Sequence, residues 1–94
     1  MPNWSFENGN CPNDLNAFDK VNKWLTYNSS NYFHKCATDT NVLVPQNFVG
    51  KQYPKNGDAY SGITGFFLTN DFREYIAVKL KQKLTVNAPY CLKF

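Results

Sequence analysis

Apolar and polar residues alternate most clearly near the C-terminal end of the chain. In the segment 75–84 one side is apolar and the other side is basic: Ile76, Val78, Leu80 and Leu84 against Lys79, Lys81 and Lys83. This period of two predicts a half-buried antiparallel strand. A turn over residues 86–89 and a second alternating segment, 90–94, follow it. The pattern therefore predicts one half of a hairpin whose sheet should continue.

Upstream the pattern is shorter and more often interrupted. Residues 4–7 read as a short strand that ends at the Asn8-Gly9 turn. Between residues 14 and 25 the apolar positions recur every three or four residues, which is compatible with a short helical turn or an irregular loop. Turn-forming residues then separate three short candidate strands, at 31–35, 48–52 and 59–63. The expected fold class is all-β.

Length and composition restrict the class of protein. The 94 residues, at 10.8 kDa, suit one domain and exclude a two-domain enzyme with an interdomain cleft. Apolar residues make up 43% and aromatic residues 17%, so we expect a folded chain rather than a disordered one. Only 18% of residues are charged, and 13 are asparagine. Such a neutral, hydrogen-bonding surface is typical of secreted β proteins.

Charge and hydropathy exclude several partners. The net charge of +3 is too small to predict a nucleic-acid partner. The longest apolar stretch, residues 65–68, is far shorter than the roughly 20 residues that span a bilayer, so no membrane insertion is expected. We interpret the lysine side of segment 75–84 as a solvated strand face or a protected sheet edge. The chain shows no export signal, which leaves a cytoplasmic protein or an exported one whose signal has been removed.

Three cysteines bear on that choice. They have no C-x-x-C spacing, and the chain has one histidine, which makes a structural zinc site a poor interpretation. One disulfide fits better, and Cys11 with Cys36 is the pair that we favour. Cys91 is then a free buried thiol, or it pairs outside this chain.

The residues that catalysis needs are scarce. His34 is the one possible histidine base, and it lies two residues from Cys36, so both could share one face of a strand. We interpret them as ordinary strand or loop residues. No pair of acids stands in a setting that suggests glycosidase chemistry, and the chain is predicted not to be an enzyme.

Aromatic residues gather in the middle of the chain beside amides and acids. A sugar ring needs an aromatic platform next to hydrogen-bonding groups, and this composition offers both. The alternative is that these rings pack the core. The predicted ligand-binding residues are Trp24, Tyr27, Tyr32, Tyr53, Asp58 and Tyr60.

An ordered series of motifs covers nearly the whole chain. Its main members are Asn3-x-Ser5-Phe6-Glu7, Gly57-x-x-Tyr60-x-Gly62-Ile63, Leu80-x-Gln82-x-Leu84 and Tyr90-x-Leu92-x-Phe94. The series resembles the galactose-binding-like jelly rolls that include many carbohydrate-binding modules. It is more closely similar to the N-terminal domain of gliding-motility-associated surface proteins, some fused to OmpA-like domains, in bacteria with type-nine secretion. Trp4 departs from the proline that is usual at its position.

The resemblance implies an antiparallel β-sandwich of the jelly-roll type at a bacterial cell surface. Because the family's jelly roll continues for several strands, it implies that residues 1–94 are the N-terminal part of a longer domain. In some relatives a structural calcium lies near the opening motif, and Glu7 would be the candidate ligand here. No other cofactor is expected.

Two functions follow as hypotheses. The first is a non-catalytic, secreted or cell-surface module that binds polysaccharide or another cell-surface glycan, with a role in adhesion or motility. The second is a structural module whose open sheet is completed by strand addition from another protein chain. The strand pattern at residues 90–94 and the leftover Cys91 motivate the second.

Overall fold

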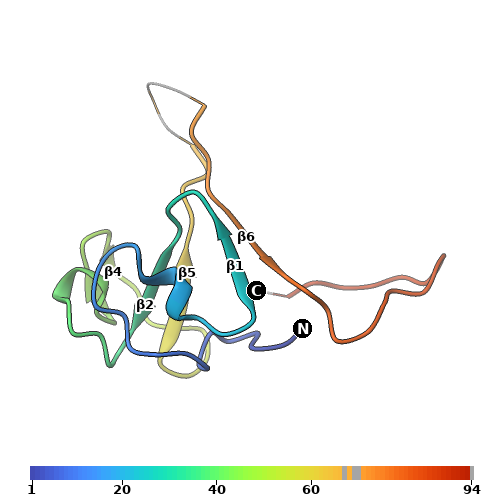
Figure 1. The fold of residues 1–94 in the computed structure, drawn as a ribbon, viewed down its shortest axis with the longest axis horizontal. Coiled ribbons are helices and arrows are strands. Elements are labelled where there is room, and N and C mark those ends of the chain that lie inside the picture. Colours follow the sequence, from blue (N-terminus) through green and yellow to red (C-terminus); the bar gives the residue numbers. More distant parts are fainter. Residues whose placement is uncertain (67, 69–70, 94) are drawn as a thin grey trace.

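The computed structural model describes residues 1–66, 68 and 71–93. In these residues the chain forms three two-stranded antiparallel sheets, β1–β6, β2–β5 and β3–β4, with two 3-10 helices (Figure 1). In chain order the elements are η1 (Ala17–Lys20), β1 (Trp24–Tyr27), β2 (Asn31–His34), η2 (Thr40–Val42), β3 (Gln46–Asn47), β4 (Gly50–Lys51), β5 (Ala59–Gly62) and β6 (Tyr75–Val78). The fold is thus small and β-rich, and the sandwich itself stays a prediction.

The sheets β1–β6 and β2–β5 are formed by the same two stretches of chain, residues 24–34 and residues 59–78. β1 leads into β2, and their antiparallel partners β6 and β5 follow in the reverse order, with Trp24 opposite Val78 and His34 opposite Ala59. Residues 28–30 connect β1 to β2, and the longer link 63–74 connects β5 to β6. The amide of Glu74 donates to the carbonyl of Thr64 at 2.9 Å, which holds the two ends of this link together (Figure 1).

Strand β2 is buried on both faces. Tyr32 and Phe33 are consecutive, so their side chains point to opposite sides of the β2–β5 pair. On one side Tyr32 packs with Phe18, Val21 and Ala59, bordered by Phe6, Trp24 and Ile76. On the other side Phe33 packs with Val42 and Val44, bordered by Ala37 and Tyr60. Two small cores result, one for each face of β2–β5.

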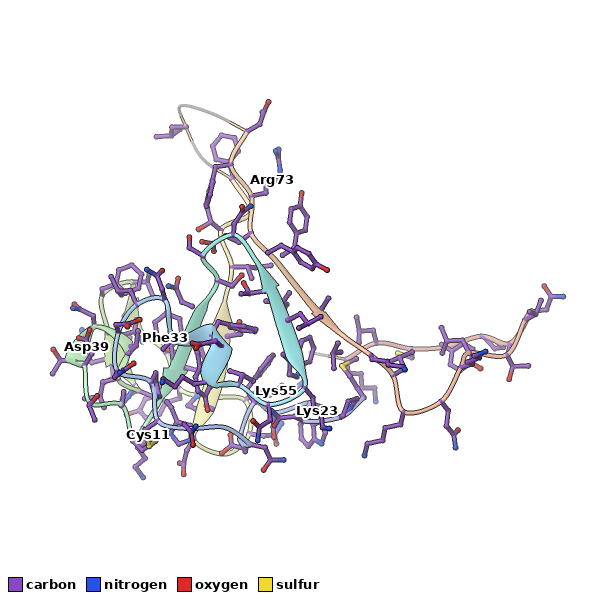
Figure 2. All side chains as sticks on the ribbon, viewed as in Figure 1. Cys11, Lys23, Phe33, Asp39, Lys55 and Arg73 are labelled. Atoms are coloured by element: carbon purple, nitrogen blue, oxygen red, sulfur yellow. A yellow bond between two sulfur atoms is a disulfide. The ribbon has the colours of Figure 1, made fainter. Side chains whose placement is uncertain are left out.

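A disulfide ties the N-terminal segment to the end of β2. Cys11 and Cys36 are bonded, with their Cα atoms 5.5 Å apart (Figure 2). This confirms the pairing predicted from the sequence. Cys91 is free but exposed, so the expectation of a buried thiol is wrong.

Several local predictions are confirmed and others are corrected. The candidate strands at 31–35 and 59–63 correspond to β2 and β5, whereas the segment 48–52 contributes only β4. Residues 4–7 form turns instead of a strand, and Phe6 takes a positive φ of 62°. The helical period over 14–25 yields only η1, because Trp24 and Leu25 already belong to β1.

The predicted strand 75–84 ends early, at Val78. Its partner β1 begins at Trp24, opposite Val78, because the preceding Lys23 has a left-handed φ of 75°. Beyond Val78 no described strand is available to accept hydrogen bonds, and an unpaired strand is not stable alone.

Residues 79–93, the C-terminal arm, leave the sheets after β6 (Figure 1). The turn expected at 86–89 is present, with the Ala88 amide bonded to the Thr85 carbonyl at 3.3 Å. Residues 90–93 form no strand, and Phe94 lies outside the described residues. Exposed apolar side chains remain along the arm: Leu84, Val86, Tyr90 and Leu92.

Candidate functional site

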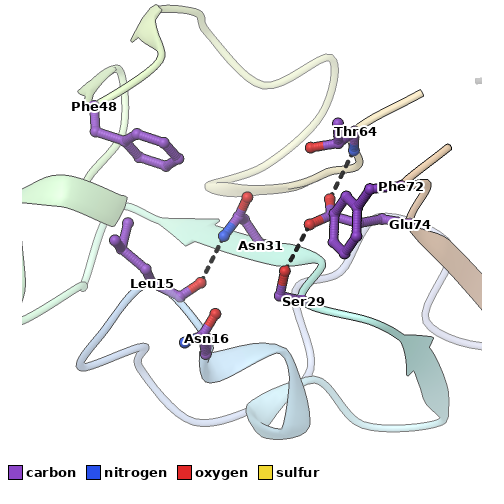
Figure 3. A pocket seen from close by; sticks show the side chains of 8 residues that line it. All are labelled: Leu15, Asn16, Ser29, Asn31, Phe48, Thr64, Phe72 and Glu74. Atoms are coloured by element: carbon purple, nitrogen blue, oxygen red, sulfur yellow. Dashed lines mark hydrogen bonds between the residues drawn. The ribbon is translucent and has the colours of Figure 1, made fainter. Parts of the chain in front are cut away.

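A hollow of about 420 Å³ lies where the start of β2 meets the ends of the 63–74 link (Figure 3). Its lining residues come from four separate segments: Leu15, Asn16, Ser29, Asn31, Phe48, Thr64, Phe72 and Glu74. The β2–β5 register and the closed base of the 63–74 link bring these segments together. The hollow is therefore a product of the tertiary fold.

Glu74 is the acid of the hollow, and its residue is only 6% exposed. Its two carboxylate oxygens accept from different neighbours: Ser29 Oγ donates to Oε1 at 2.9 Å, and the Thr64 amide donates to Oε2 at 2.7 Å (Figure 3). Among the described residues no lysine, arginine or histidine nitrogen lies within 4.0 Å of this carboxylate. Within the part of the chain that the structure describes, the donors to this carboxylate are therefore neutral groups.

Two asparagines add amide groups to the same hollow. The Asn31 side chain donates to the Leu15 carbonyl at 2.6 Å, which fixes its orientation and leaves its amide oxygen as an acceptor (Figure 3). The backbone amide of Asn16 donates to Asp14 Oδ1 at 2.8 Å. This Asx turn places the Asn16 side chain at the hollow.

Two phenylalanines provide the apolar part of the lining. Phe48 is 51% exposed, and its ring stacks on Phe33 with the centroids 6.1 Å apart. Phe72 is half-buried and lies on the other side of Asn31 from Phe48 (Figure 3). An apolar surface and hydrogen-bonding groups therefore occur within one concave region.

The six aromatic and acidic residues predicted as a binding platform do not form one cluster. Tyr32 is 0% exposed, Trp24 borders the first core and Tyr60 stacks on Phe33, so these three rings are structural in this fold. Tyr27 is exposed on β1, opposite Tyr75. Tyr53 is exposed beside Lys51, and Asp58 lies near Lys35 at 4.0 Å. None of the six lines the hollow.

Burial changes the acidity of Tyr32. Its hydroxyl donates to the Phe6 carbonyl at 3.0 Å. Desolvation, with a smaller contribution from the negative charge of Glu7, raises the pKa of Tyr32 from 10.0 to about 12. The Tyr32 hydroxyl therefore stays protonated in the folded chain well above its usual range.

Glu7 has a structural role in the fold. Its Oε1 accepts from the amides of Asp58 and Ala59 at 2.9 and 3.0 Å, which joins the N-terminal segment to the start of β5. Gly57 has a φ of +65°, and a Cβ there would lie 2.3 Å from the same oxygen. Glycine at this position lets the carboxylate approach the backbone.

Calcium at Glu7 stays a prediction, and the surroundings of this residue argue against it. Calcium takes six to eight oxygen ligands. Glu7 lines a second hollow, separate from the one beside Glu74, together with Lys23 and Lys81, and the positive charges of these lysines oppose a dication. The part of the chain that the structure describes holds no group of three His, Cys, Asp or Glu residues suited to a metal ion. The described residues therefore do not fit calcium at Glu7.

The residues that come together left little trace in the sequence pattern. Phe48 begins the candidate strand 48–52 but lies between β3 and β4, Phe72 lies between β5 and β6, and Glu74 precedes the first residue of β6. The burial that distinguishes Glu74 from the other acids is known only from the fold.

Comparison with known proteins gives no relative: no family model, no curated protein and no solved structure matches the chain. Across residues 1–66, 68 and 71–93, no helix is long and apolar enough to cross a membrane. The likeness to galactose-binding-like jelly rolls thus rests on the sequence motifs alone.

Proposed function

We propose that this protein is a non-catalytic, secreted or cell-surface module that binds a glycan in the hollow beside Glu74. The observation that carries the proposal is the position of Phe48 and Phe72 on either side of Asn31, with Phe72 beside Glu74, in one hollow (Figure 3). The site differs from the one expected from the sequence, although the chemistry is the same.

The chemistry of a sugar ring matches this lining. A pyranose ring has apolar C–H faces that pack on aromatic rings, and hydroxyl edges that need hydrogen-bond partners. The Phe48 ring offers the first, while the amides of Asn16 and Asn31 and the carboxylate of Glu74 offer the second. A volume of about 420 Å³ lies within the range of ligand pockets, roughly 300–1,000 Å³.

The residues that line the hollow favour sugar binding over sugar hydrolysis. Glycosidases use two carboxyl groups placed on opposite sides of the scissile bond. Among the described residues that line this hollow, Glu74 is the one acid. The disulfide between Cys11 and Cys36 supports an oxidising compartment, such as a cell exterior or periplasm.

Affinity gel electrophoresis against a panel of soluble polysaccharides tests this function. The wild-type chain should be retarded by at least one polymer, and Phe48→Ala should abolish or strongly reduce the retardation. Tyr53→Ala is the matched control, because Tyr53 is an exposed aromatic residue outside the hollow. Retardation by no polymer, or equal loss in both variants, contradicts the proposal.

A second function, assembly by strand addition, is favoured by a separate observation. The C-terminal arm leaves β6 with its apolar residues exposed, and Val86 is 85% exposed. The arm also carries four lysines and no acid: Lys79, Lys81, Lys83 and Lys93. A partner strand with an acidic border would cover this surface.

Hydrogen exchange distinguishes this second function from a monomeric module. If the arm pairs with another chain, its amides should be protected at high protein concentration and sedimentation should report a complex. Fast exchange throughout residues 79–93 in a monodisperse monomer contradicts strand addition.

A further inference from the structure

We propose that the glycan bound in the hollow carries a protonated amine, and that Glu74 is the anion that recognises it. This inference rests on the proposed glycan function and specifies its ligand as an amino sugar. It starts from the environment of one buried carboxylate.

A carboxylate removed from water is costly unless a cation or several hydrogen bonds compensate it. An ionised carboxylate can accept about four hydrogen bonds. Glu74, 6% exposed, receives one from Ser29 and one from the Thr64 amide. Donors from the described residues therefore use about half of its accepting capacity.

No cationic side chain of the described residues lines this hollow. The lining that the structure describes contains no lysine, arginine or histidine, and Glu74 is the only titratable group in it. The neighbouring Arg73 is exposed, and its guanidinium donates to the Asp71 carbonyl at 3.4 Å. Within the described chain the one ion pair joins Lys35 to Asp58, away from the hollow.

The negative charge of Glu74 favours some classes of sugar over others. A uronic acid or a sulfated sugar would place a second negative charge beside Glu74, which a site of low polarity opposes. A neutral sugar would offer hydroxyl donors but leave the charge uncompensated. An ammonium group donates up to three charge-assisted hydrogen bonds and neutralises the carboxylate.

The apolar lining also favours a cation. An ammonium group near the face of an aromatic ring is attracted by the ring's electron density. Phe48 is half exposed at the hollow and Phe72 is half-buried there, so a bound amino sugar would contact aromatic carbon as well as the carboxylate.

Titration with three oligosaccharides of equal length tests the proposal: one of glucosamine, one of N-acetylglucosamine and one of glucose. At a pH where the amine is protonated, the glucosamine oligomer should bind the wild-type chain about tenfold or more tightly than either neutral oligomer. Added salt should weaken glucosamine binding and leave binding of the neutral oligomers nearly unchanged.

Glu74→Gln removes the charge and keeps one side-chain oxygen as an acceptor. We expect this variant to lose the preference for glucosamine while it still binds neutral oligomers. Asp19→Asn is the matched control, because it makes the same charge change at an exposed acid outside the hollow. It should retain the preference in full.

The outcomes separate the two proposals. If no oligomer binds, here or in the polysaccharide panel, the glycan function itself is contradicted. If neutral and amino oligomers bind equally, or if the preference survives in Glu74→Gln, the glycan function stands and the role of Glu74 is wrong. The salt dependence needs no variant, so the test holds even if Glu74→Gln does not fold.

Discussion

Tyr32 shows how a single position joins two distant segments. Its ring lies in the first core, and its hydroxyl donates to Phe6, which belongs to the opening motif. The sequence could not separate this tyrosine from an exposed one, because composition and spacing carry no information on which face of β2 is covered. Since both faces are covered, the alternation of apolar and polar residues that usually marks the buried side is missing.

The raised pKa of Tyr32 predicts a loss of stability in alkali. Below pH 10 the hydroxyl is protonated in both states, so the stability is fully present. Between pH 10 and about 12 the unfolded chain loses this proton while the folded chain keeps it. The free energy of unfolding should therefore fall across this window, by at most about 3 kcal/mol, and then level off.

Urea unfolding at pH 9 to 12 measures this effect in a Cys91→Ser background, which prevents thiol exchange with the disulfide. Tyr32→Phe is the control: it should lose about 1 kcal/mol at neutral pH, from the missing hydrogen bond, and show a smaller alkaline decrease. Equal alkaline decreases in both chains would contradict the assignment.

Gly57 and Gly65 provide a matched pair of glycine substitutions. Gly57→Ala places a Cβ against the Glu7 carboxylate and strains a left-handed residue, so unfolding should become easier by about 2 kcal/mol or more. Apart from residues 64–66, no described atom lies within 4 Å of a Cβ placed at Gly65, and Gly65→Ala should change stability by less than about 0.5 kcal/mol. Thermal unfolding of both variants makes the comparison. Similar melting temperatures would mean that the Glu7 contact contributes little.

At the scale of elements, the sequence identified strands better than their lengths. β2, β5 and β6 each fall inside a predicted segment, because β-branched and aromatic residues between turns are a local signal. The end of β6 at Val78 depends on where β1 begins, and that pairing is not local. The same holds for the hollow, whose residues come from four segments.

The disulfide carries the prediction that belongs to the scale of elements. It closes a sequence separation of 25 residues and ties the segment before η1 to the end of β2. Replacing both cysteines with serine should lower the free energy of unfolding by about 3 kcal/mol, mainly through a less restricted unfolded chain. Denaturant titration checks this, with Cys91→Ser as the single-cysteine control. The prediction would be contradicted if Cys91→Ser lowered the free energy of unfolding and the double replacement did not.

At the scale of the whole molecule, the chain is more extended than a compact domain of its length. The radius of gyration is 14.3 Å, compared with about 12 Å expected for 94 residues. The C-terminal arm contributes to this extension, since it leaves the sheets after β6 (Figure 1). Outside the arm the net charge is −1, from six basic and seven acidic residues, so the positive charge of the chain resides in the arm.

Limited proteolysis with trypsin tests this organisation. Cleavage after Lys81 and Lys83 should precede cleavage at Lys20 or Lys35, because the first pair is in the exposed arm. The remaining fragment should keep its disulfide and its β-rich circular dichroism. Earlier cleavage in the β1–β2 region would contradict the arrangement, and an arm that resists cleavage at high protein concentration would favour strand addition.

If the hollow beside Glu74 is the ligand site, NMR mapping of backbone amides during a titration will locate the ligand there. Titration with the best-binding oligosaccharide should produce the largest shifts at Asn31, Phe48, Phe72 and Glu74, with small changes at Tyr27, Tyr53 and the arm. Shifts centred on Tyr27 or Tyr53, with none around Glu74, would contradict it.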